Sequence, residues 1–379
     1  MTKDKVTIGF VRRGFSASGG AENYLKRLAA GVAAAGYEAH LFTSEDWPAS
    51  EWNFGLITRL RARSPVAFAD RIEAARLEKR CHLLVSLERI WRCDVYRAGD
   101  GVHRAWLQHR RKMLTPLRQL TAGFHRKHRD IVRLEEALFR DRAAGRVIAN
   151  SRMVKNEIAA FYNYPPEKIE LIYNGVPLDA FRPSTELRAA QRSLLGLSEH
   201  DIALLFVGSG WERKGLRQAV QALEACSAPR LQLFVAGRGN EREFRAHGVH
   251  FCGVVRDMPA LYAAADIFVL PTFYDPFSNA CLEALAAGLS VITTRANGFH
   301  EIIEQGVHGA IIDEAADVEA IARAIKFWSQ PARRKEARPA ILERASQFDI
   351  SKNVDRTLAV LLQEAAASAD AASGKMRKT

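Results

Sequence analysis

Two carboxylates eight positions apart, Asp275 and Glu283, have the spacing in this chain that most directly suggests chemistry. The apolar run 267–270 predicts a buried strand that ends at Pro271, and leucines at helical spacing after 281 predict a helix. The acids therefore flank a strand–loop–helix junction, the kind of place where doubly wound sheets bind nucleotides. Spacing alone leaves open a Glu283 that merely faces solvent.

A pair of cations, Arg213 and Lys214, ends a loop that follows another apolar run, 203–207. Arginine can fork across two oxygens of a diphosphate, and lysine acts as a point charge beside it. Cations fixed in this way stabilise negative charge that develops on a phosphate group during a reaction. A surface pair without a ligand is the alternative interpretation.

The first half of the chain opens with a predicted strand at 6–11, a glycine-bearing loop and a helix that ends near Gly36. This unit is Rossmann-like, but its glycines lack the G-x-G-x-x-G spacing. Gly19 and Gly20 precede the helix, where the absence of side chains lets a phosphate or an acceptor hydroxyl approach backbone amides. Farther on, Asp100 stands between two glycines at the end of a strand. A plain turn is the alternative at both places.

The run AADIFVLP at 264–271 and the run EALAAGLSVITT at 283–294 resemble the family-4 retaining glycosyltransferases of the GT-B fold. The resemblance implies an α/β protein with two Rossmann-like domains facing a cleft and a C-terminal helix that returns to the first domain. It also implies that Glu283 holds the ribose hydroxyls of a nucleotide sugar. The donor sugar would be held by the carboxylate of Asp275, a catalytic residue, and by the amides of Phe277, Ser278 and Asn279. The family usually has Glu where Asp275 stands.

The same resemblance covers further motifs. The pattern FVGS…RKG implies that Arg213 and Lys214 bind the donor diphosphate in place of a metal. Gly19 and Gly20 would lie near the leaving phosphate, and Val254 and Val255 would lie against a uracil. The chain has no Asp-x-Asp pair and no His/Cys cluster with ligand spacing, so we expect no metal and no cofactor beyond the donor substrate.

The segment DVYRAGDG at 94–101 narrows the resemblance to the lipopolysaccharide-core glucosyltransferases, which add glucose to an inner-core heptose. It implies that Asp100 stands beside the anomeric centre as a catalytic residue. We therefore expect a retaining hexosyltransferase that moves glucose from UDP-glucose onto a lipid-linked saccharide acceptor. A UDP-sugar 2-epimerase on the same fold and a basic nucleic-acid-binding module are the rival hypotheses.

The chain has a formal net charge of +12, and part of this charge is concentrated between residues 101 and 129. This stretch contains eight lysines and arginines, no acidic residue, and apolar residues between the cations. Such a stretch suits an anionic membrane surface, and the resemblance places it where the related enzymes dock on the inner membrane. Phosphate backbones of nucleic acids attract the same charge, and a solvated helical face is a third interpretation. We expect membrane contact, no nucleic acid, and these contact residues: Arg104, Trp106, Arg110, Arg111, Lys112 and Phe124.

The chain has no apolar run of the ~18 residues needed to span a bilayer, and its five cysteines are scattered. These features predict a cytoplasmic protein with reduced thiols, peripheral on the cytoplasmic face of the inner membrane.

We expect two domains, at 1–177 and 200–344, joined by a linker at about 178–200. The segment YNGVPLDAFRP resembles the inter-domain segment of the family. The returning helix is expected at 345–365, followed by a disordered tail at 366–379 that is rich in alanine and serine.

Overall fold

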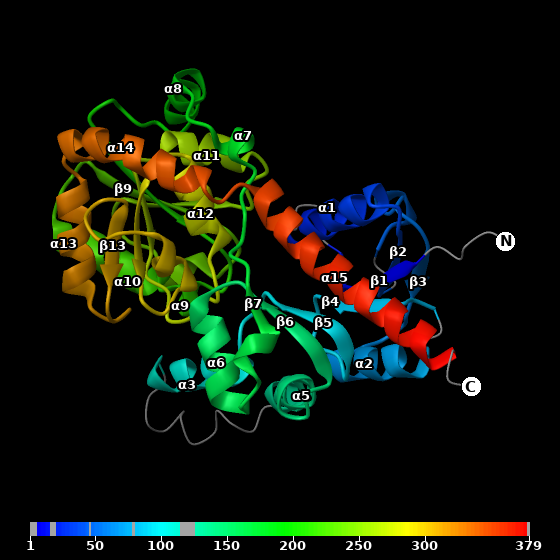
Figure 1. Cartoon of the computed structure of the whole chain (residues 1–379). Coiled ribbons are helices and arrows are strands. Elements are labelled where there is room, and N and C mark those ends of the chain that lie inside the picture. The colour runs from blue at the N-terminus through cyan, green and yellow to red at the C-terminus, as the bar shows by residue number, and fades with distance from the viewer. Residues whose placement is uncertain (1–5, 16–19, 45–46, 78–79, 114–125, 377–379) are drawn as a thin grey trace. The chain divides into compact units, whose positions relative to one another are not determined.

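The computed structural model describes residues 6–15, 20–44, 47–77, 80–113 and 126–376 of the chain (Figure 1). It divides into two compact units, one formed by 1–173 and 352–379 and the other by 174–351. Each unit contains one fully parallel sheet whose strands are joined by helices. The predicted fold class, two Rossmann-like α/β domains, is confirmed.

The sheet of the first unit has the order β3-β2-β1-β4-β5-β6-β7, which reverses direction between β1 and β4. Its strands are β1 (Thr7–Val11), β2 (Glu38–Thr43), β3 (Ile57–Arg59), β4 (Leu83–Ser86), β5 (Cys93–Ala98), β6 (Ala144–Ala149) and β7 (Ile169–Leu171). The helices around it are α1 (Gly20–Ala34), α2 (Pro65–Ala74), α3 (His103–Met113), α5 (Arg126–Glu135), α6 (Arg152–Tyr162) and α15 (Ile350–Met376).

The second unit repeats this plan in the order β10-β9-β8-β11-β12-β13, with the reversal between β8 and β11. Its strands are β8 (Ile202–Val207), β9 (Leu231–Ala236), β10 (Val249–Gly253), β11 (Ile267–Leu270), β12 (Ser290–Thr294) and β13 (Gly309–Ile312). Its helices are α7 (Leu178–Phe181), α8 (Thr185–Leu194), α9 (Trp211–Lys214), α10 (Leu216–Cys226), α11 (Met258–Ala264), α12 (Asn279–Ala286), α13 (Val318–Trp328) and α14 (Pro331–Ser346). All residues of β11 and β12 are buried, as expected for strands covered on both faces.

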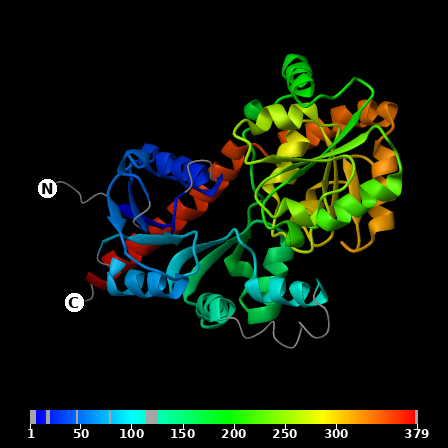
Figure 2. The same ribbon diagram turned by 180° about the vertical axis from the view of Figure 1, so that it is seen from behind.

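The C-terminal helix belongs to the first unit from residue 352 onward, as expected for a returning helix. In both views α15 runs beside α1 (Figures 1 and 2), and the hydroxyls of Tyr24 and Thr357 share a hydrogen bond of 2.9 Å. The expectation of a disordered tail from 366 is wrong up to Met376, where α15 ends. Alanine has the highest helix propensity, which explains the continuation.

The segment expected to be a linker, 178–200, is instead a structured part of the second unit. It forms α7 and α8, and the guanidinium group of Arg192 on α8 is buried between the Ala264 carbonyl and the Asp266 carboxylate. An arginine held by two such acceptors fixes α8 on the sheet edge, so this segment cannot act as a free tether.

Four of the five cysteines are buried, and none is joined in a disulfide within the described chain. Across those same ranges, no helix combines the length and the hydropathy that crossing a bilayer requires.

Candidate functional site

The predicted cations and the first predicted acid meet at the carboxyl edge of the second sheet. Lys214 on α9, which follows β8, places its Nζ 3.1 Å from Oδ2 of Asp275, which follows β11. Arg213 donates to the Tyr274 carbonyl at 2.6 Å, and its Nη1 lies 3.9 Å from the same Oδ2. The strand order reverses between β8 and β11, so the cluster lies at the position where doubly wound sheets bind ligands.

Two glycines allow the chain segments of this cluster to approach one another closely. A Cβ on Gly208, whose φ is +144°, would lie 2.7 Å from Cδ of Lys214, so the lysine stem passes directly over this residue. A Cβ on Gly215, whose φ is +79°, would lie 2.0 Å from the Pro271 carbonyl oxygen. Only glycine permits both the backbone conformation and the close approach. The loop that contains Arg213 and Lys214 is therefore held tightly against the end of β11.

The second predicted acid, Glu283, projects from α12 and is partly exposed. Its Oε2 accepts a hydrogen bond of 2.8 Å from the Tyr262 hydroxyl, and its carboxylate has no other hydrogen-bond partner among the described residues. Burial raises the pKa of Glu283 to about 7, although the bond from Tyr262 and the charge of Lys214 act in the opposite direction. A carboxylate with a free oxygen and a pKa shifted toward neutrality is typical of a functional site.

The loop at 275–279 is shaped by a buried residue that the sequence analysis missed. Asn297 is fully buried, and its Oδ1 accepts from the amides of Ser278 and Phe299, both at 3.1 Å. The Ser278 amide, which was expected to hold a donor sugar, is therefore already engaged within the protein. The signal that was available is the Asn-Gly dipeptide at 297–298, which is typical of a tight turn.

The other residues of this loop differ in accessibility. Phe277 is buried against Phe299, with 5.8 Å between the ring centroids. Asn279 is exposed and begins α12, so its amide belongs to the first turn, where helix amides have no acceptor within the helix. The Ser278 side chain caps the same helix by accepting from the Cys281 amide at 3.4 Å. The Asn279 amide is thus the predicted donor-binding amide that the local structure leaves best placed for a ligand.

The turn expected to contact a base follows β10. Val254 is 56% exposed, an unusual position for a large apolar side chain, and Val255 beside it is partly buried. The turn is fixed because the Gly237 amide donates to the Gly253 carbonyl at 2.7 Å. All strands of this sheet are parallel, so the turn lies on the same edge as Lys214 and Asp275.

The first unit also gathers charges at its carboxyl edge. Arg12, just after β1, pairs with Glu88 at 2.8 Å and with Glu22 of α1 at 3.1 Å. Asp100, which follows β5, has a side chain that is 70% exposed, and its Oδ2 lies 3.7 Å from Nη1 of Arg89. Asp100 is therefore accessible, as the sequence hypothesis requires. Gly20 begins α1, whereas Gly19 lies outside the described residues.

A buried carboxylate that the sequence analysis missed, Glu135, supports the Asp100 loop. It accepts hydrogen bonds from Nε of Arg89 at 2.9 Å, the amides of His103 at 2.6 Å and Arg104 at 3.2 Å, and the Tyr162 hydroxyl at 2.9 Å. Two of these donors are amides in the first turn of α3, where a negative charge is favoured. Nothing in the local sequence distinguishes Glu135 from a solvent-facing acid of α5.

The predicted membrane-contact residues are only partly described. Phe124 lies outside the described residues, and so does the side chain of Lys112. Two of the other cations are engaged within the protein. Arg104 lies 3.4 Å from Glu136, and Arg110 donates to His128 at 3.0 Å. The remaining pair consists of Arg111, which is exposed, and Trp106, which is partly buried.

The described residues contain no group of three or more His, Cys, Asp or Glu side chains that could hold a metal ion.

Comparison with known families assigns both halves of the chain. Residues 18–180 match the model of Glycosyltransferase Family 4, and residues 201–330 match the model of Glycosyl transferases group 1. Among solved structures, WaaG, a glycosyltransferase involved in lipopolysaccharide biosynthesis, superposes with a TM-score of 0.78 at 22% identity. That alignment covers 93% of this chain and 99% of WaaG. The protein has the two-domain GT-B fold.

A second solved structure is that of HepE from Anabaena in complex with UDP and glucose, with a TM-score of 0.70 at 19% identity. It covers 93% of this chain and 98% of that one. Among curated proteins, a D-inositol 3-phosphate glycosyltransferase of Catenulispora acidiphila is 31% identical over 242 residues, or 58% of this chain and 57% of the relative. The chain spans about half the length of the curated relatives that it matches.

Proposed function

We propose that this chain, whose two halves carry the domains of family-4 and group-1 glycosyltransferases, transfers glucose from UDP-glucose to a lipid-linked saccharide of the lipopolysaccharide core. The observation that carries the proposal is the cluster of Lys214, Arg213 and Asp275 at the strand-order reversal of the second sheet. On the same edge lies the carboxylate of Glu283, one oxygen of which is bonded to Tyr262 and the other of which has no hydrogen-bond partner among the described residues. This edge offers cations for a diphosphate and a hydrogen-bond acceptor for a ribose.

The electrostatics of the cluster fit a leaving nucleoside diphosphate. Two cations share the single carboxylate of Asp275, which is 7% exposed, so the cluster keeps an excess of positive charge. The bond between the sugar C1 and the phosphate oxygen breaks in the transition state, and negative charge then grows on the diphosphate. Fixed cations stabilise that charge more in the transition state than in the ground state. We assign Arg213 and Lys214 this role, which a metal ion would otherwise fill.

We infer a retaining reaction in which the acceptor oxygen bonds to C1 on the face that the diphosphate leaves. The acceptor hydroxyl gives its proton to the departing phosphate oxygen, so no separate base is required. Asp100 is assigned to stabilising the positive charge that develops on the sugar or to positioning the acceptor. Its exposed carboxylate on the first unit is consistent with either task.

Different observations support the proposed donor and the proposed acceptor. UDP and glucose are the ligands of HepE, which shares the fold. The exposed Val254 gives the second unit an apolar surface for a flat base. The lipopolysaccharide acceptor rests on the DVYRAGDG motif around Asp100 and on the likeness to WaaG. The exposed cations of α3 and α5 are proposed to bring the enzyme to the cytoplasmic face of the membrane that contains such an acceptor.

A second candidate acceptor is D-inositol 3-phosphate, because a relative that is 31% identical over 242 residues carries that name. Under this alternative the acceptor is a small anion and the basic stretch has no membrane to contact. The donor site is the same under both hypotheses.

The test is a radiolabel transfer assay with purified full-length protein. UDP-[¹⁴C]glucose, UDP-[¹⁴C]GlcNAc and a GDP-sugar are each combined with truncated inner-core lipopolysaccharide, with D-inositol 3-phosphate, or with no acceptor, with and without EDTA. The proposal expects transfer from UDP-glucose to the lipid acceptor that EDTA does not reduce, and an α-anomeric product by NMR. Transfer to inositol phosphate alone would establish the second candidate. Conversion of UDP-GlcNAc without any acceptor would favour an epimerase.

A further inference from the structure

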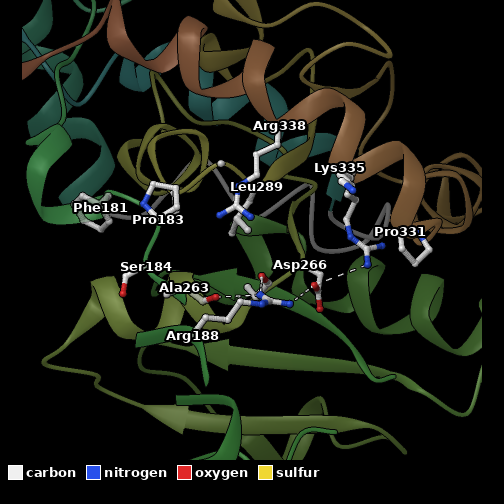
Figure 3. A pocket seen from close by; sticks show the side chains of 14 residues that line it. Phe181, Pro183, Ser184, Arg188, Ala263, Asp266, Leu289, Pro331, Lys335 and Arg338 are labelled. Carbon is white, nitrogen blue, oxygen red and sulfur yellow. Dashed lines mark hydrogen bonds and ion pairs between the residues drawn. The ribbon is translucent and has the colours of Figure 1, made fainter. Parts of the chain in front are cut away.

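A cavity lies at the opposite edge of the second sheet from the cluster described above. It has a volume of about 230 Å³ and is bounded by α14, by the loop before α8, and by the turns that lead into β11 and β12 (Figure 3). Asp266 stands just before β11 and Leu289 just before β12, whereas Lys214 and Asp275 follow the ends of strands. The cavity is therefore at the amino edge of the sheet and shares no lining residue with the proposed donor site.

The cavity is strongly basic. Four cations line it, and the only acid in the lining is Asp266. The cations are Arg188 on α8 and Arg334, Lys335 and Arg338 on α14. Figure 3 shows the α14 side chains on one side of the cavity and Arg188 with Asp266 on the other. A cavity with this lining carries a clear excess of positive charge.

Asp266 is shared by three arginines and does not pair with every cation of α14. Its Oδ1 accepts from Arg188 at 2.7 Å, and its Oδ2 accepts from Arg192 at 3.0 Å and from the Ala203 amide at 2.8 Å. Arg334 of α14 forms a longer ion pair with the same carboxylate, 3.8 Å from Oδ1. One carboxylate is thus shared by three arginines, and within the described residues Lys335 and Arg338 of α14 are left without a counter-ion.

Two of the α14 cations have no partner in the described part of the chain. Neither Lys335 nor Arg338 makes a hydrogen bond or an ion pair there, and both are exposed. Arg338 is nevertheless placed by packing, because a Cβ on Gly288 would lie only 3.1 Å from its Nε. Partial desolvation of the guanidinium group and the charge of Arg188 both lower the pKa of Arg338, and desolvation is also the main cause that lowers the pKa of Arg334. Cations whose charged form is disfavoured in this way would gain stability from a bound anion.

We propose that this pocket binds a small phosphate monoester at a site separate from the nucleotide-sugar site. Guanidinium groups match the geometry of phosphate oxygens, and an ammonium group adds a point charge, so Arg338 and Lys335 together suit a doubly charged phosphate. The volume is below the range of about 300–1,000 Å³ that is typical of pockets for drug-sized ligands. It therefore suits a phosphate with a small attached group rather than a whole nucleotide sugar. Phe181, Pro183 and Ser184 provide a mixed surface for that group.

The experiment measures the binding of inorganic phosphate to full-length protein by calorimetry, at constant ionic strength with chloride as the balancing anion. The double variant Lys335→Ala/Arg338→Ala should bind phosphate at least about tenfold more weakly, since bonds to charged groups are lost. The matched control is Arg333→Ala on the same helix, because Arg333 points to Gln330 and Phe327 and does not line the cavity. It should bind phosphate as the wild type does.

Phosphate could also occupy the diphosphate cluster, so UDP binding is measured on the same variants. The proposal expects the double variant to lose phosphate binding and to keep its UDP affinity. Unchanged phosphate affinity in the double variant would overturn it, and so would a parallel loss of UDP binding. Vesicles of phosphatidic acid in phosphatidylcholine separate a free ester from a lipid headgroup. Equal sedimentation of wild type and double variant is expected, and a loss confined to the double variant would assign the site to lipid instead.

Discussion

Replacing Glu283 by Gln tests the proposed ribose contact without removing the side chain. The amide keeps the shape and can still accept hydrogen bonds, but it loses the charge. Hydrogen bonds that involve a charged group contribute about 1.5–3 kcal/mol each, and neutral ones contribute about 0.5–1.5 kcal/mol. Two ribose hydroxyls would therefore lose about 2–3 kcal/mol together. At 1.4 kcal/mol per factor of ten, UDP should bind about 30- to 150-fold more weakly.

The pKa of Glu283, about 7, makes this difference depend on pH. At pH 8.5 the wild-type carboxyl group is ionised and the full difference is expected. Below the pKa it is protonated and resembles the amide, so the two proteins should converge near pH 5.5. The phosphates of UDP also titrate, but they do so equally for both proteins and cancel in the ratio of the dissociation constants.

Tyr262→Phe provides an independent check on the origin of this pKa. The variant keeps the buried ring and removes the hydroxyl that donates to Oε2 at 2.8 Å. Because that bond lowers the pKa of Glu283, its loss should move the pH midpoint of UDP binding upward.

The stability of the folded protein should change with pH in the direction opposite to the UDP affinity of the wild type. The pKa of Glu283 is higher in the folded protein than in the unfolded chain, so its favourable contribution is complete below the unfolded pKa and is lost as the pH rises through 7. The Gln variant should therefore unfold at a higher temperature than the wild type at pH 8.5.

The assay is calorimetric titration with UDP at pH 5.5, 7 and 8.5. Glu212→Gln is the matched control, because Glu212 is an exposed acid of α9 that pairs with Arg217. It should leave the affinity unchanged. Equal UDP affinity for wild type and Glu283→Gln at pH 8.5 would refute the ribose role of Glu283.

The remaining predictions concern three other parts of the molecule. Lys214→Ala should lower kcat more than it weakens donor binding, because charge on the diphosphate grows as the bond breaks; a strong requirement for Mg²⁺ would contradict this account. Asn297→Ala should lower the free energy of unfolding by about 2–4 kcal/mol in urea titrations, because the buried amides of Ser278 and Phe299 lose their acceptor; a loss below about 0.5 kcal/mol would be inconsistent with that network. Charge reversal of the exposed Arg111 and of Lys127 on α5 should release the protein from anionic vesicles at low salt and leave transfer to a soluble acceptor fragment unchanged. Duplex DNA as a competitor distinguishes this docking from nucleic-acid binding.

The local elements and their chemistry could be read from the sequence. Strands buried on both faces are near-continuous apolar runs, so β8 and β11 and the loops that follow them were identifiable without a structure. The family resemblance implied that Arg213, Lys214, Asp275 and Glu283 all contact one nucleotide sugar, and parallel strands do place the loops that follow them at one carboxyl edge. The contact between Lys214 and Asp275, which are 61 residues apart, agrees with this placement.

The partners of these residues could not be read in the same way. Tyr262 lies on a different helix from Glu283, and Asn297 reaches Ser278 only through the packing of two loops. Glu135 has the local sequence of a surface acid, and it becomes a fully buried anchor only because four donors converge on it. Hydrogen bonds of this kind depend on burial and direction, which sequence spacing does not encode.

The alanine-rich tail and the expected linker show the same division. Composition identified the tail, and the resemblance of YNGVPLDAFRP to an inter-domain segment suggested the linker. Helix propensity determines the conformation of the tail, and tertiary packing determines that of residues 178–200. The basic pocket depends most strongly on tertiary structure. Its cations come from α8 and α14, about 150 positions apart, and their surplus of charge exists only because one carboxylate, Asp266, is shared among them. The sequence by itself determined the fold class and the residue types at the edges of the second sheet. The tertiary structure decided which charges are paired, because pairing depends on distances that only the packed helices set.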